Sequence, residues 1–221
     1  MAWPSFADIL SKVRTELNET AAGLWTDAEL EGWINDGQRD IAAKTLCIDN
    51  VAQATTTANS RVVPWSGTKV KYVEYIPSSG KPVALQKIQL KQIGRIPANS
   101  TTPQYWAPWA SSVGQCIILD PKPGATTFTL NLYVADYPAY ELSSASDTPL
   151  LPSEFHLLVV DYAVYVAFLK ARKWSQANVL YQSYIHQINA LRPKYAMPQI
   201  DTLESLKVPD VIQYQQADGG P

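Results

Sequence analysis

Glu154, His156 and Asp161 are the one local grouping in this sequence that combines a carboxylic acid, an imidazole and a second carboxylate. Such a set could perform general acid–base catalysis, for example the hydrolysis of a cell-wall polymer. In an α-helix, however, His156 is rotated by about 200° from Glu154, whereas Asp161 lies near the face of Glu154. Because the side chains do not converge, capping and solvation explain them better. We expect no catalytic residue, and a wall-degrading enzyme using Glu154 remains the weaker alternative.

The rest of the sequence carries no signature of a metal, cofactor or nucleotide site. His186 is isolated, and no second histidine or cysteine stands at the spacing that a zinc site requires. Cys47 and Cys116 are far apart, so two buried, reduced thiols are the expected state. No G-x-S-x-G, P-loop or G-x-G-x-x-G motif is present. We therefore expect no metal and no cofactor.

Aromatic side chains form the more informative set for binding. Such rings can stack on sugars, but they are equally typical of a sheet core and of subunit interfaces. No constellation of Asp, Asn and Arg accompanies them to bind sugar hydroxyls, so a core and interface role is favoured. A binding module with an aromatic carbohydrate-binding surface remains the alternative. The residues concerned are Trp65, Tyr105, Trp106 and Trp109.

The composition describes a folded chain with little charge. Hydrophobic residues make up 46% of the 221 residues and charged residues 17%, so we expect partner subunits to cover some apolar surface. The formal net charge of −2, with no cluster of Lys and Arg, argues against a general nucleic-acid binder. No basic-then-apolar signal or lipidation motif is present, so synthesis in the cytoplasm is expected.

Four segments repeat apolar residues at the spacing of an α-helix. Residues 5–19 and 26–46 each open with a capping box, Ser-x-x-Asp and Thr-x-x-Glu. Residues 152–172 are apolar almost all round, which is typical of a helix buried on most sides, and the other elements should pack around it. Ser175 is expected to cap a fourth helix, which Pro193 ends.

Residues 51–141 show the alternation and the β-branched and aromatic runs of strands. Turn signals such as Ser66-Gly67 separate five to seven strands, and the short connections predict antiparallel pairing. The overall prediction is an α+β fold. Two N-terminal and two C-terminal helices form a four-helix bundle, and an antiparallel β-domain is inserted between the two pairs. The predicted domains are 1–50 and 142–192 for the two halves of the bundle, 51–141 for the inserted β-domain and 193–221 for an extended C-terminal arm.

The arm carries no lasting periodicity, yet apolar residues recur where a solvated tail would be polar. They are too few to bury one another, and such a segment gains order by laying itself on another chain. We therefore predict that the arm docks on a partner. Its predicted contact residues are Leu203, Leu206, Val208, Val211, Ile212 and Tyr214.

Three stretches in this order resemble the phage head-to-tail adaptor (connector or neck) proteins, which form the ring beneath the portal. They read LWTDAELEGWINDGQRDIA, TPQYWAPWASSVGQCIILDPKPGATTFTLNLYVADYP and LLPSEFHLLVVDYAVYVAFLKAR. The resemblance implies a structural virion protein without catalysis, assembled as a homo-oligomeric ring of twelve subunits. It implies docking onto the portal protein above and onto tail or nozzle proteins below. It also implies that genomic DNA passes through the lumen. We expect no sequence-specific DNA binding and no membrane partner.

Overall fold

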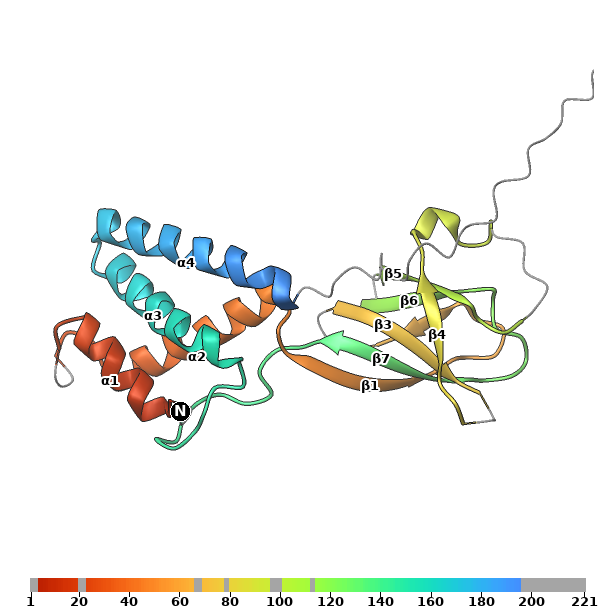
Figure 1. Cartoon of the computed structure of the whole chain (residues 1–221), viewed down its shortest axis with the longest axis horizontal. Coiled ribbons are helices and arrows are strands. Elements are labelled where there is room, and N and C mark those ends of the chain that lie inside the picture. The colour runs from red at the N-terminus through yellow and green to blue at the C-terminus, as the bar shows by residue number, and fades with distance from the viewer. Residues whose placement is uncertain are drawn as a thin grey trace, which may run out of the picture.

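The computed structural model describes residues 4–19, 23–65, 69–77, 80–95, 101–111 and 114–195. Within these ranges the chain forms a mixed α+β structure with four α-helices and a curled sheet of seven strands. Figure 1 shows an elongated molecule with the helices at one end and the sheet at the other. The α+β prediction is therefore confirmed for the described residues.

The helices are α1 (Phe6–Glu16), α2 (Asp27–Thr45), α3 (His156–Lys170) and α4 (Trp174–Tyr195). Both predicted capping boxes are present, with Ser5 and Thr26 as the N-cap residues of α1 and α2. In each box the side-chain oxygen accepts the N–H of the third helical residue, whose carboxylate accepts the N-cap N–H in return. These bonds join groups three residues apart, so the local sequence is enough to fix where both helices begin.

Helix α3 is central among the helices, but the strands do not pack around it as predicted, because they bury their apolar side chains in a separate cluster; the start of α3 also differs from the prediction. A 3₁₀ turn, Ser153–Phe155, comes first, and no side chain caps α3. The helix packs against the other three, and Val159, Ala163 and Ala167 are fully buried. Leu157 is 57% exposed, so one side of α3 faces solvent. Among the described residues, no helix is both long and apolar enough to span a bilayer.

The prediction for the ends of α4 was wrong. Ser175 lies inside the helix, because the Ala177 N–H bonds the Lys173 carbonyl, which places the first helical hydrogen bond two residues before the one that a cap at Ser175 would begin. Pro193 also lies inside α4, which continues to Tyr195. The Tyr195 ring packs on Phe155 with 5.1 Å between ring centroids. This tertiary contact supports a last turn that the sequence pattern alone would end earlier.

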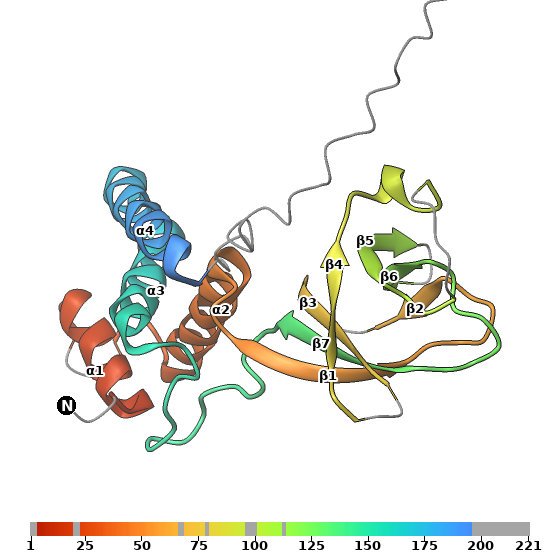
Figure 2. The same cartoon turned by 45° about the vertical axis from the view of Figure 1, so that its right-hand side comes forward.

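The strands are β1 (Asp49–Thr55), β2 (Val62–Pro64), β3 (Lys69–Ile76), β4 (Val83–Lys87), β5 (Tyr105–Ser111), β6 (Gly114–Asp120) and β7 (Thr129–Ala135). Their order across the sheet is β1-β7-β3-β4-β5-β6-β2, and Figure 2 shows the sheet curling from β1 round to β2. All neighbours pair antiparallel except β4 and β5, where Gln86 and Lys87 lie opposite Tyr105 and Trp106 in parallel.

The prediction of antiparallel pairing throughout was therefore wrong for this one pair. The segment that joins β4 to β5, residues 88–104, is much longer than a hairpin loop. It exceeds the dozen or so residues that a parallel crossover needs, and it includes a 3₁₀ turn at Leu90–Gln92. The rule that predicts antiparallel pairing applies to short connections. This connection is long enough for the chain to return to the same end of the sheet.

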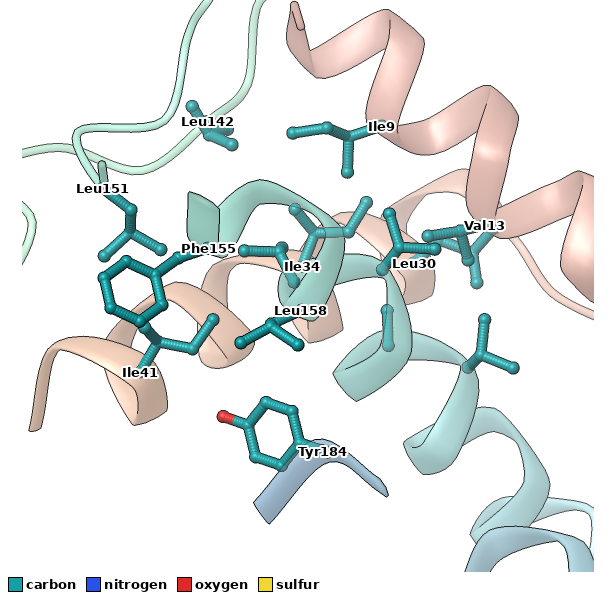
Figure 3. Close-up of a cluster of buried hydrophobic side chains, with 14 of the residues drawn as sticks. Ile9, Val13, Leu30, Ile34, Ile41, Leu142, Leu151, Phe155, Leu158 and Tyr184 are labelled. Atoms are coloured by element: carbon teal, nitrogen blue, oxygen red, sulfur yellow. The ribbon is translucent and has the colours of Figure 1, made fainter. Parts of the chain in front are cut away.

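The helices and the sheet bury their apolar side chains in two separate clusters. Figure 3 shows the helical cluster, where side chains from all four helices and from the loop before α3 meet. The sheet cluster lies inside the curl of the strands. Its fully buried members include Val63, Val73, Ile117, Leu119, Leu130 and Leu132. Each part of the molecule is therefore stabilised by burial of its own apolar surface.

Candidate interaction surfaces

The three residues that could have formed an acid–base site each have a different structural partner. Glu154 accepts a hydrogen bond from Lys194 at 3.2 Å. His156 is buried with its Nε2 at 2.8 Å from the Leu151 carbonyl oxygen, and burial lowers the pKa of its imidazole. Asp161 accepts a hydrogen bond from the Gln187 amide at 3.4 Å, and burial raises the pKa of its carboxyl group. These contacts join the start of α3 to the preceding loop and to α4.

The cysteines are free and buried, as predicted, and Cys47 belongs to the helical cluster. Burial raises the pKa of the Cys47 thiol, so its protonated form is favoured. Within the described ranges, no three His, Cys, Asp or Glu side chains lie close enough to hold a metal ion.

The four predicted aromatic contact residues differ in how far their side chains are exposed to solvent. Trp106 is only 1% exposed and lies in the sheet cluster, where the Lys87 Nζ sits 5.4 Å from its ring centroid and burial lowers the pKa of Lys87. Its indole therefore packs the sheet core and leaves no ring face for a partner. Tyr105 and Trp65 are half-buried, whereas Trp109 is 40% exposed. Among these four, Trp109 is the most accessible ring.

Trp65 and Trp109 line one shallow cleft of about 260 Å³ at the sheet end of the molecule. They lie near each other because β2 and β5 flank β6, where Trp65 is opposite Gln115 and Trp109 is opposite the next residue, Cys116. Lys69 and Gln115 add an ammonium and an amide to the lining. Spacing in the sequence gives no sign of these two polar residues, because strand pairing alone brings them to the cleft.

A second apolar surface lies at the helical end, where sequence analysis predicted none. Val179 is 69% exposed and Trp174 63% exposed, both on α4. A groove of about 390 Å³ runs beside them between the end of α1, α3 and α4. Val179 lies outside the row of apolar residues that forms the buried face of α4. An apolar residue in that position is the one sequence signal that could have indicated the groove. Its lining residues are Glu16, Val164, Phe168, Ser175, Gln176, Val179 and Leu180.

A lysine joins the two parts of the molecule. The Lys71 side chain is 7% exposed, and its Nζ donates to the Leu46 carbonyl at 2.7 Å and to the Tyr195 carbonyl at 3.5 Å. It also pairs with the Asp49 carboxylate. The last carbonyls of α2 and α4 carry partial negative charge, which favours a cation at this place. Lys71 therefore holds both helix ends against the start of β1.

The predicted contact residues of the arm, Leu203, Leu206, Val208, Val211, Ile212 and Tyr214, lie outside the described residues.

An α+β protein with two cores and an accessible apolar surface at each end has the features of an assembly component. A family model described as the SU10 adaptor protein matches residues 4–202, so the chain belongs to the SU10 adaptor protein family. It is thus a phage adaptor-type structural protein, as the resemblance in the sequence indicated. No curated protein matches the chain.

Proposed function

We propose that this protein is a head-to-tail adaptor that forms a dodecameric ring between the portal and the tail of a phage virion. Family membership over residues 4–202 is the observation that carries this proposal. A protein that joins two partners needs two separate contact surfaces, and a closed ring needs two more that are complementary. The aromatic cleft is lined by the strands and the helical groove by the helices, and these elements lie at opposite ends of the molecule (Figure 1), which suits contacts to different neighbours.

The proposed division of the chain follows its two hydrophobic clusters. The four helices form a bundle, the strands between α2 and α3 form the inserted β-domain, and the residues after Tyr195 form an arm that contacts a partner in the assembled neck. Support comes from the shared core of the four helices and the separate core of the sheet. Genomic DNA passes through the ring without sequence-specific contacts, as the formal net charge of −2 favours.

Negative-stain microscopy of the purified protein, alone and mixed with the portal protein, tests the proposal. We expect rings in at least the mixture, with a mass by native mass spectrometry that corresponds to twelve copies. The double variant Trp65→Ala, Trp109→Ala is the matched probe of the cleft, since both rings line it and neither is fully buried. A wild-type protein that stays monomeric with the portal would contradict the proposal.

The aromatic cleft also supports a second candidate function, the binding of a carbohydrate. Two indoles and the Gln115 amide line it, and sugars stack on aromatic rings while their hydroxyls bond to amides. In that case tryptophan fluorescence would change on titration with cell-wall glycans, and the change would be lost in Trp109→Ala. A wall-degrading activity using Glu154 is the less favoured alternative, because Lys194 and the surface of α4 already engage that carboxylate.

A further inference from the structure

Strand β1 is one edge of the sheet and pairs with β7 alone among the described strands. The Thr56 N–H donates to the Phe128 carbonyl at 2.9 Å, just beyond the last residue of β1. At the other end of the strand, the Asp136 N–H donates to the Ile48 carbonyl at 3.0 Å. Because bonding alternates along an antiparallel pair, the even-numbered residues of β1 bond to β7. The odd-numbered residues direct their N–H and C=O groups to the open side.

This open side of β1 is not protected in the usual ways. Its residues DNVAQAT include no proline, no lysine and no bulge, which are the devices that normally block an exposed edge. The Val51 N–H bonds the Asn50 side chain at 2.8 Å. The outward N–H groups of Gln53 and Thr55 meet no acceptor within the described part of the chain. Two outward donors of β1 are therefore available to another strand.

The opposite edge, β2, is closed. The Trp65 N–H bonds the Gln115 carbonyl, and the same alternation leaves Val62 and Pro64 facing outward. The Ser60 hydroxyl accepts the Val62 N–H at 3.2 Å and donates to the Val62 carbonyl at 3.3 Å. Pro64 has no N–H to offer. The contrast between the two edges indicates that β1, and not β2, is built to receive a further strand.

The chain itself leads to this edge. Tyr195, the last described residue, places its carbonyl 3.5 Å from the Lys71 Nζ, and the same ammonium pairs with Asp49 at the start of β1. The described chain therefore ends near the start of β1, and residues 196–221 follow it in the sequence. Among them 208–214, VPDVIQY, is rich in β-branched and aromatic residues, and seven residues span about 23 Å, the length of β1.

We propose that in the free subunit the edge of β1 binds residues 208–214 of the same chain as an added strand. The tether raises the effective concentration of the segment at the edge far above that of any other chain. The added strand would cover the open donors of β1 and so prevent edge-to-edge association before assembly. This inference does not depend on the proposed ring, because it concerns the unassembled protein.

The position of Pro209 determines which backbone N–H groups of the added strand would face β1. Pro209 has no N–H, so a strand containing it must turn that position away from β1. In such a strand the N–H groups of residues 211 and 213 would also face away from β1, while the N–H of Ile212 would point toward β1. Ile212→Pro removes a bond of the ladder, whereas Gln213→Pro removes an N–H that faces solvent. The two variants are therefore a matched pair that differ by one residue in register.

Amide hydrogen exchange of the full-length protein, followed residue by residue by NMR in dilute solution, tests the proposal. We expect Gln53 and Thr55 to exchange slowly in the wild type, and at least about tenfold faster in Ile212→Pro. Gln213→Pro should keep their protection. Ala52 and Ala54, whose N–H groups bond β7, should be unchanged in both variants and report that the sheet stays folded.

Two results would overturn the added strand. One is fast exchange of Gln53 and Thr55 in the wild type. The other is an equal effect of the two proline variants, whether none or complete loss of protection. Protection that disappears on dilution would overturn the assignment to the same chain, because an intramolecular strand is independent of protein concentration. Failure of ring formation would leave all of these readouts intact, so the two proposals fail separately.

Discussion

The ammonium group of Lys71 donates a hydrogen bond of 2.7 Å to the backbone carbonyl of Leu46 and so ties β3 to the end of α2. The two residues come from different hydrophobic units of the molecule, one from the sheet and one from the helical end. Because the amine is almost buried and also meets the Tyr195 carbonyl, one side chain fixes how the two units are joined.

Replacing Lys71 by Met should destabilise the protein by about 2 kcal/mol, since it removes hydrogen bonds from a charged, buried donor and leaves the Leu46 carbonyl without it. Urea unfolding measures the change. Lys69→Met is the control, because Lys69 lies on the same strand but is exposed, and it should stay within about 0.5 kcal/mol of wild type. Equal effects of the two variants would show that Lys71 does not hold the junction.

Replacing Val159 by Asp should destabilise the helical core by several kcal/mol, of the order of the stability of a whole domain, because it buries a carboxylate without a partner. The melting temperature followed by circular dichroism reports the loss. Leu157→Asp on the same helix should have little effect, since that side chain already faces solvent. A Val159→Asp protein that melts within a few degrees of wild type would refute the central role of α3.

Removing the exposed tryptophan should affect assembly, whereas removing the buried tryptophan should affect stability. Trp109→Ala should weaken ring formation or portal binding while the melt hardly changes, whereas adding Trp65→Ala should also lower the melt because Trp65 packs against the sheet cluster. Trp106→Ala should lower the stability by roughly 3–5 kcal/mol, because it opens a cavity in the sheet core. Sedimentation velocity and thermal melts distinguish the two effects. Normal assembly of the double variant together with lost glycan binding would favour the carbohydrate-binding alternative.

Stability should fall as the pH falls from about 4.5 to 2, in part through Glu29. The hydrogen bond from Lys170, with further bonds from Thr26, lowers the pKa of Glu29 from 4.5 to about 2. The unfolded chain therefore binds more protons than the folded protein in this window, and the contribution of Glu29 is lost as it protonates.

Lys170→Met should flatten this part of the pH dependence of the urea midpoint, because it removes the main cause of the shift. Lys173→Met should leave the slope unchanged, since Lys173 lies over the Phe168 ring and away from Glu29 in its contacts. An unchanged slope in Lys170→Met would show that the ion pair does not form in solution.

Much of the fold could be predicted from the sequence because the signals are local. The capping boxes of Ser5 and Thr26 join groups three residues apart, and the apolar pattern of residues 152–172 identifies a helix that other elements must cover. The order of helices, strands and helices follows from the change of hydrophobic period along the chain. These features depend on backbone geometry within a few residues, which any folded context would share.

The partners of each strand were decided only by the tertiary structure. Trp106 and Trp109 stand three residues apart in β5, so the strand period alone puts them on opposite faces, but only the tertiary structure decided which face is the core and that Trp109 reaches the cleft. The parallel pairing of β4 with β5, the cleft between Trp65 and Trp109 and the open edge of β1 all arise from contacts between distant segments. Alternating apolar residues show that a strand has a buried face, but they do not determine which strand lies beside it.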